Sequence, residues 1–185
     1  MKHGTLYGVG LGPGDPELIT LKAHRLITAA AVVVYPALTG AESFARSIAM
    51  ELIPRDAREI ALEIPMTTAR APAQAAYDHG AKMISDELSA GQDVIFLCEG
   101  DPFFYGSFMY LFSRLSARFS VEVVPGVASV TACAARAGLP LVARNATLTV
   151  LPGPLPGETL RESILAAGAV AIMKVGRHLQ KVRSV

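Results

Sequence analysis

Short apolar segments alternate with helix-like segments along most of this chain. In the helix-like segments apolar residues recur three or four positions apart, as Phe108, Leu111 and Leu115 do. A strand–helix–strand alternation at this spacing is typical of βαβ units, so we expect an α/β fold with a mostly parallel sheet. The predicted strands are Thr5–Val9, Ala31–Tyr35, Glu59–Ile64, Asp93–Cys98 and Val121–Val124, and the predicted helices are Pro16–Thr28, Glu42–Leu52, Ala73–Ala90 and Ser107–Arg118.

A second region of similar design follows Pro125-Gly126. A helix is predicted over Ala128–Ala137, and Gly138 is placed to close it as a C-terminal cap. Two strands and an intervening helix are then predicted, over Thr147–Leu151, Ala169–Lys174 and Glu158–Ala167. We therefore expect an N-terminal α/β domain over 1–122 and a C-terminal α/β domain over 123–185. Because two strands alone do not make a stable sheet layer, we expect the second domain to be incomplete.

Composition excludes several classes of function. The 185 residues are 51% hydrophobic and 18% charged, which provides a substantial core and argues against disorder. A net charge of +1 argues against a nucleic-acid surface read by charge, and no apolar run is long enough to cross a membrane. The two cysteines, Cys98 and Cys133, suit neither a disulfide framework nor a metal site. They are interpreted as reduced, buried thiols of a cytoplasmic protein.

The first glycine-rich loop lies in the stretch GLGPGDPELITLKA, residues 10–23. Its glycines are spaced GxGxG rather than in the GxGxxG pattern of dinucleotide sites, and Pro13 lacks a backbone N–H. Asp15 and Glu17 put two carboxylates at the start of the following helix, where a phosphate would otherwise bind. The pattern disfavours a phosphate-bearing ligand. It leaves two interpretations, a tight turn without a ligand or a loop that approaches an uncharged or cationic group.

Two further loops follow predicted strands in the same way. One reads EGDPFFYGS, residues 99–107, and the other VPGVAS, residues 124–129. Ligands of open α/β sheets bind beyond the carboxyl ends of the strands, so the three loops predict one shared pocket. Asp101 offers a carboxylate, and Phe103, Phe104 and Tyr105 offer flat apolar surfaces. The alternative is that Asp101-Pro102 is a simple turn and that the aromatic rings belong to the core.

These blocks together resemble the signature segments of the tetrapyrrole methylases, a family that uses S-adenosylmethionine as methyl donor. The resemblance is carried by GVGLGPGDPELITLKA, EGDPFFYGSF and VVPGVASVTA, and their order and spacing also fit. It implies two α/β domains with a cleft between them, a homodimer, and a chain that continues beyond residue 185. It also implies that the first loop shapes the donor and substrate cleft and holds no phosphate and no metal.

The resemblance also implies roles for individual residues. The residues implied in donor binding are Pro13, Glu99, Gly100, Asp101, Phe104, Ala128, Ser129 and Val175, with Met173 and Lys174 beside the last of them. Family members usually carry a small residue where this chain has Glu99. Asp101 and Tyr105 are the candidates for proton transfer in the cleft.

A tetrapyrrole is rich in carboxylates, so basic side chains are expected around it. We propose Arg144, Lys174 and Arg177 as substrate-binding residues, with Arg70 as a further candidate. Lys174 belongs to a basic cluster that continues through His178, Lys181 and Arg183. An ordinary solvated helix face is the alternative interpretation for the residues after Arg177.

Within the family, the segments IPMTTAR, FLCEGDPFFYGSFMYL and AIMKVGR are most similar to those of the members that methylate C(20) of precorrin-2 to give precorrin-3A in cobalamin biosynthesis. Methylation of cobalt-factor II at C(20), or of a different ring carbon, remains an alternative. A dinucleotide-dependent oxidoreductase is opposed by Asp15 and by the glycine spacing. A non-catalytic α/β binding domain would bind no S-adenosylmethionine.

Overall fold

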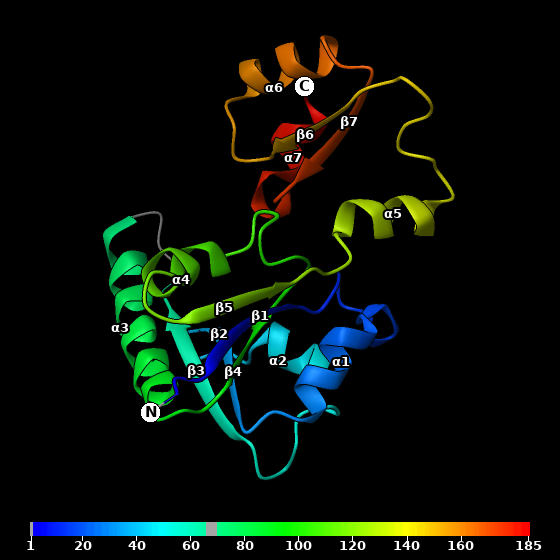
Figure 1. Cartoon of the computed structure of the whole chain (residues 1–185). Coiled ribbons are helices and arrows are strands. Elements are labelled where there is room, and N and C mark those ends of the chain that lie inside the picture. The colour runs from blue at the N-terminus through cyan, green and yellow to red at the C-terminus, as the bar shows by residue number, and fades with distance from the viewer. Residues whose placement is uncertain (1, 66–69) are drawn as a thin grey trace. The chain divides into compact units, whose positions relative to one another are not determined.

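The computed structural model describes residues 2–65 and 70–185, with the side chain of Arg70 left out. The chain divides into two compact units, Met1–Ala128 and Ser129–Val185 (Figure 1). In the first unit the strands are β1 (Thr5–Gly10), β2 (Val32–Leu38), β3 (Arg58–Ile64), β4 (Val94–Cys98) and β5 (Ser120–Val124). Its helices are α1 (Leu21–Thr28), α2 (Phe44–Ala49), α3 (Arg70–Ser89) and α4 (Phe108–Leu115).

The sheet of the first unit is parallel throughout, in the order β3-β2-β4-β1-β5. Helices α3 and α4 cover one face and α1 and α2 cover the other (Figure 1). The core accordingly has two layers, one around Phe96 and Phe108 and one around Val9 and Leu97. Every residue of β4 is buried, as expected of a central strand covered on both faces. The predicted α/β class and parallel sheet are confirmed.

The segment after the first loop forms two helical elements where the sequence predicted one helix over Pro16–Thr28. Pro16–Leu18 is a single 3-10 turn, and Asp15 caps it by accepting a hydrogen bond from the N–H of Glu17 at 2.9 Å. Thr20 then caps α1 by accepting from the N–H of Ala23 at 3.2 Å. The second cap restarts the helix, because its hydroxyl satisfies a donor that a continuous helix would pair internally.

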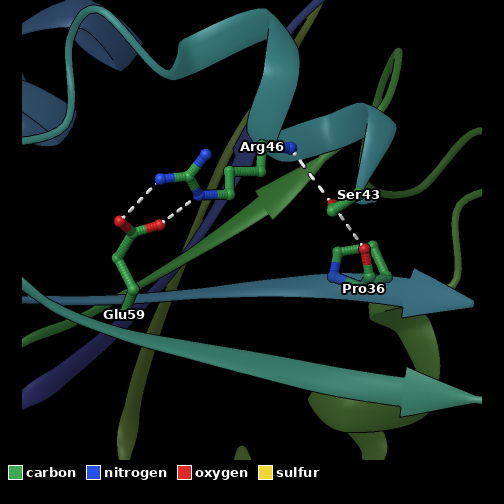
Figure 2. A network of polar contacts seen from close by, with 4 residues as sticks. All are labelled: Pro36, Ser43, Arg46 and Glu59. Atoms are coloured by element: carbon green, nitrogen blue, oxygen red, sulfur yellow. Dashed lines mark hydrogen bonds and ion pairs between the residues drawn. The ribbon is translucent and has the colours of Figure 1, made fainter. Parts of the chain in front are cut away.

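An ion pair ties the edge strand β3 to α2 (Figure 2). The guanidinium of Arg46 donates to both carboxylate oxygens of Glu59, at 2.6 and 2.9 Å. The N–H of Arg46 donates to the hydroxyl of Ser43 at 3.1 Å, and that hydroxyl donates to the carbonyl of Pro36 in β2 at 2.6 Å. The contacts join two strands and a helix on the α1/α2 face of the sheet.

The second unit contains α5 (Ser129–Ala137), β6 (Leu148–Pro152), α6 (Gly157–Leu165), β7 (Ala169–Met173) and α7 (Leu179–Arg183). Strands β6 and β7 pair in parallel, which the alternation of elements predicted. Gly138 closes α5 with a φ of 65°, as predicted for a C-terminal cap. Most described apolar side chains of the second unit are only half-buried, and Leu151 and Leu160 are the ones that are buried.

Two further features differ from the sequence-based prediction. The boundary between the units follows Ala128, whereas the sequence placed it between residues 122 and 123, because β5 pairs with β1 and so belongs to the first sheet. Cys98 is buried, but Cys133 is exposed on α5, so the prediction that both thiols are buried was wrong for Cys133. No helix among the described residues has both the length and the apolar character that crossing a membrane requires.

Candidate functional site

Three loops of the first unit meet beyond the carboxyl ends of neighbouring strands, those of β4, β1 and β5. The N–H of Gly12 donates to the carbonyl of Gly100 at 3.2 Å, and the N–H of Gly100 donates back to Gly12 at 2.7 Å. The N–H of Gly126, in the loop after β5, donates to Oδ2 of Asp101 at 3.0 Å. The structure therefore brings the three glycine-containing loops into contact, and the shared pocket that the sequence predicted there stays a prediction.

Close packing among the loops explains two of the glycines. A Cβ at Gly126 would lie 2.0 Å from the carbonyl oxygen of Gly100, and a Cβ at Gly10 would lie 2.5 Å from the N of Gly126. These neighbours are backbone atoms, which cannot rotate aside as a side chain would. Backbone of the same unit therefore occupies the space beside Gly10, which at this position favours the tight turn over the close approach of a ligand, the two interpretations that the sequence left open.

Gly100 differs from its two neighbours. Its φ of 63° favours glycine, and an added Cβ would meet no atom within 4 Å. This position is open on one side, which suits close approach by a bound molecule.

Asp101 joins two of the loops through its carboxylate. Oδ1 accepts from the N–H of Phe103 at 2.9 Å and from that of Phe104 at 3.1 Å, while Oδ2 accepts from Gly126. Hydrogen bonds from backbone N–H groups to a carboxylate are charge-assisted and therefore strong. Both oxygens are thus engaged in holding the loops, which makes Asp101 a positioning residue in this structure.

The other acidic residue of this loop, Glu99, has no hydrogen-bond or ion-pair partner among the described residues. The residue is exposed, yet the surrounding chain partly desolvates its carboxylate, and this desolvation raises the pKa of Glu99. A carboxylate without a partner at the edge of the sheet can accept a hydrogen bond, a proton or a cation.

Aromatic side chains flank the same loop. Phe104 and Tyr105 are each 37% exposed, and their ring centroids lie 5.3 Å apart in an edge-on arrangement. Phe103 packs edge-on against Phe112 of α4, with 5.1 Å between centroids, and so belongs partly to the packing under the loop. All three rings are nevertheless partly exposed, Phe103 most of all at 47%, so the flat exposed surface that the sequence predicted is present.

The first loop lacks the features of a phosphate site. Pro13 provides no N–H, and the carboxylate of Asp15 already accepts the free N–H of Glu17. Two carboxylates at this helix start favour a cationic or neutral group. The arrangement suits an adenosyl sulfonium, which carries a positive charge and no phosphate.

The remaining predicted donor-binding residues lie in the second unit or directly before it. Ser129, Met173 and Lys174 line a pocket of about 480 Å³ between α5 and β7, together with Cys133 and Leu139. Val175 follows directly and is half-buried. Ala128 is the last residue of the first unit.

The three proposed substrate-binding residues are all exposed, namely Arg144, Lys174 and Arg177. In the continuing basic cluster the ammonium of Lys181 donates to the carbonyl of Leu155, so Lys181 holds the loop after β6. Partial desolvation, together with the positive charges of Lys181 and Arg177, lowers the pKa of His178. Residues 66–69 of the IPMTTAR segment lie outside the described residues, as does the side chain of Arg70.

Backbone strain supplies a signal that sequence reasoning could not use. In the described chain, the residues other than glycine with a positive φ are Tyr105 at 57°, Arg144 at 49° and Lys174 at 54°. Such angles cost free energy for a residue with a Cβ and are common at functional sites. All three are among the site residues that sequence analysis proposed.

A pocket of about 630 Å³ lies elsewhere in the first unit. Its lining includes Lys2, His3, Thr5 and Asp93, at the amino ends of β1 and β4. It is at the opposite edge of the sheet from the three loops and is not part of the candidate site. Among the described residues, no group of three or more His, Cys, Asp or Glu side chains is placed to hold a metal ion.

Comparison with known proteins adds close relatives. The chain is 42% identical to precorrin-2 C(20)-methyltransferase from Sinorhizobium sp, over 97% of this chain and 77% of the relative. It is 44% identical to cobalamin biosynthesis protein CobIJ from Mycobacterium tuberculosis, over 98% of this chain but 37% of that longer protein. Cobalt-precorrin-2 C(20)-methyltransferase from Salmonella typhimurium is 28% identical, over 98% of this chain and 77% of the relative.

A solved structure shares the architecture. Uroporphyrin-III C-methyl transferase from Thermus thermophilus, complexed with S-adenyl homocysteine, matches with a TM-score of 0.64 and 29% identity, over 96% of this chain and 77% of that chain. The family model of the tetrapyrrole (corrin/porphyrin) methylases matches residues 5–185. The chain therefore belongs to the tetrapyrrole (corrin/porphyrin) methylases.

Proposed function

We propose that this protein transfers the methyl group of S-adenosylmethionine to C(20) of precorrin-2, giving precorrin-3A in cobalamin biosynthesis. The observation that carries the proposal is the 42% identity, over 97% of this chain, to a precorrin-2 C(20)-methyltransferase. The lower identity to the cobalt-precorrin-2 enzyme, 28%, favours the metal-free substrate over the cobalt-bearing one.

The loops after β1, β4 and β5 meet at one edge of the first sheet, the three-loop edge, and its residues suit the donor. Gly100 is open on one side, Phe104 and Tyr105 expose aromatic surface, and Glu99 and Asp15 make the edge acidic. S-adenosylmethionine supplies a methyl group on a positively charged sulfur, which leaves as a neutral thioether. The role of Gly100, Phe104 and Tyr105 is to bind the donor and to orient its methyl group, while the two carboxylates attract the positive charge on its sulfur. Orientation alone can supply about 7–11 kcal/mol of a barrier.

The remaining predicted contacts complete the proposal. Pro13, Ala128, Ser129 and Val175 contact the donor in this account. Arg144, Lys174 and Arg177 bind substrate carboxylates, since guanidinium and ammonium groups form charge-assisted hydrogen bonds with them. Replacing Arg144 or Arg177 with Gln should raise the KM for the tetrapyrrole and leave donor affinity unchanged.

We also propose that the protein works as a homodimer in the cytoplasm. Cys98 and Cys133 are both free, which suits a reducing compartment. Light scattering on the purified protein would measure the mass, and cell fractionation would locate the protein. A monomer, or a protein found outside the cytoplasm, would contradict this part of the proposal.

The test of the proposed function is an assay with both substrates. Purified protein is incubated with S-adenosylmethionine labelled in the methyl group and with precorrin-2, and the position of the label in the product is read by NMR. Label at C(20) supports the proposal. Label at another carbon assigns a different tetrapyrrole methylase activity, and turnover of cobalt-precorrin-2 alone assigns the cobalt-bearing substrate.

A further inference from the structure

Two acidic side chains follow the central strand β4, and their surroundings differ. Three backbone N–H groups bind the carboxylate of Asp101, with donor–acceptor distances between 2.9 and 3.1 Å. Glu99, two residues earlier, has no such partner among the described residues. Only one of the two carboxylates is thus available to a reacting molecule without breaking the contacts that hold the loops together.

The proposed reaction needs a proton acceptor. The bond between sulfur and the methyl carbon breaks as the methyl group bonds to the ring carbon, and sulfur keeps the electron pair. The ring carbon then carries both the new methyl group and its original hydrogen. Loss of that hydrogen as a proton returns the C–H electron pair to the ring, so a base that takes the proton completes the balance. A positioned base typically contributes a factor of about 10²–10⁴ to such a step.

We propose that Glu99 is the general base that accepts this proton, an inference that rests on the proposed function. Glu99 directly follows the central strand β4 and precedes Gly100, the loop glycine that is open on one side. The Oδ1 atom of Asp15 at this edge accepts the N–H of Glu17. Glu99 is thus the carboxylate of the β4 loop that holds no other group.

The environment of Glu99 supports this assignment. Partial desolvation raises its pKa, which makes the carboxylate a better proton acceptor than one in bulk water. The same argument moves the proton-transfer role away from Asp101, which sequence analysis had made a candidate. Asp101 keeps the role of positioning the loops.

The test compares three substitutions at one position. Glu99→Gln keeps the shape of the side chain and removes the proton acceptor, Glu99→Asp keeps the carboxylate, and Glu99→Ala leaves room for an added carboxylate. We expect kcat to fall about 10²–10⁴-fold in Glu99→Gln while the Kd for S-adenosylhomocysteine changes less than twofold. Glu99→Asp should retain partial activity, and formate should partly restore Glu99→Ala. Thermal midpoints matching the unsubstituted protein establish that each variant is folded.

The outcomes separate failure of the inference from failure of the proposed function. A Glu99→Gln variant that turns over within threefold of the unsubstituted protein overturns the base role, while the methyltransferase assignment stands. A large loss of S-adenosylhomocysteine affinity with unchanged kcat also overturns it, since Glu99 would then bind the donor. If formate restores no activity to Glu99→Ala, the base role is rejected as well. An unsubstituted protein that neither binds S-adenosylhomocysteine nor methylates a tetrapyrrole overturns the proposed function itself.

Discussion

Both units of this chain are built from parallel strands connected by helices, but the first unit buries many more apolar side chains than the second. In the first unit a five-stranded parallel sheet is covered on both faces, and its central strand is buried throughout. In the second unit the sheet has two strands, and their side chains are half-buried except for that of Leu151, which is buried. The loops of the first unit are fixed by contacts within that unit, at Gly10, Gly100 and Gly126. The candidate site residues of the first unit are therefore held by a well-packed core within that unit, whereas those of the second unit are held by fewer buried side chains.

Matched core substitutions should show the largest effects. Leu97 in β4 and Leu160 in α6 are both fully buried, and replacing a buried leucine with alanine typically costs about 2–5 kcal/mol. We expect Leu160→Ala to increase hydrogen exchange in β6 and β7 while β1 and β4 keep their protection, because Leu160 belongs to the second compact unit and β1 and β4 belong to the first.

Exchange measured by mass spectrometry on Leu97→Ala provides the reference, since its effect should appear in the first unit. Equal loss of protection in β4 from both substitutions would show that the units unfold together, and the comparison would then fail.

Replacing one glycine in each unit with alanine should show that only the glycine packed among the three loops affects stability and donor binding. Gly126→Ala places a Cβ 2.0 Å from the carbonyl oxygen of Gly100, and overpacking of this kind typically costs about 1–3 kcal/mol. We expect a lower urea midpoint and weaker binding of S-adenosylhomocysteine. Gly157→Ala in the second unit is the control, because its Cβ would lie 3.6 Å from the nearest atom. A Gly126→Ala protein with unchanged donor affinity would show that the loop contact does not shape the site.

Replacing Asp101 tests whether its carboxylate holds the loops. Asp101→Asn retains one oxygen for the two N–H groups of Phe103 and Phe104 and presents an amide to the N–H of Gly126. Leaving such a donor unpaired costs about 1–3 kcal/mol. For Asp101→Asn we expect a stability loss in this range and weaker S-adenosylhomocysteine binding in calorimetry, with the protein still folded. Asp101→Ala should also weaken donor binding without unfolding the protein. If kcat alone fell and donor affinity and stability were unchanged, Asp101 would have a chemical role.

The ion pair between Arg46 and Glu59 should show the smallest effect. The hydrogen bonds from Arg46 lower the pKa of Glu59 from its ordinary value of 4.5. A lowered folded-state pKa means that the pair stabilises the protein above pH 4.5, and that this contribution is lost as pH falls through the folded-state value. Exposed pairs contribute about 0.2–1 kcal/mol.

Urea unfolding of Glu59→Gln and the unsubstituted protein at several pH values measures the effect of this pair. The difference between them should be greatest near neutral pH and should shrink in acid. A difference that grew as pH fell would contradict the assigned direction of the pKa shift.

Sequence reasoning predicted much of the fold because apolar periodicity and turn residues are local signals. The strands of both sheets lie within a few residues of their predicted positions, and Gly138 caps α5 as expected. The restart of the helix at Thr20 was missed because the run from Pro16 onward is consistent with one continuous helix. The exposure of Cys133 was missed because the apolar character of its neighbours does not show which face of α5 is covered.

At the site, sequence alone located the loops but not their contacts. The mutual packing of Gly10 and Gly126 joins residues far apart in the chain, and no local pattern reports it. For the same reason the sequence could not show that Asp101 is occupied by backbone N–H groups while Glu99 is available. Residue types suggested the candidate side chains, and the structure was needed to show which of them hold the loops together.

The central claim is that the three-loop edge of the first unit binds the adenosyl donor. Calorimetric titration of the full chain with S-adenosylhomocysteine tests it most directly. We predict saturable binding at about one molecule per chain. No binding by well-folded protein would contradict the claim and would leave this chain as a family member without the donor site described above.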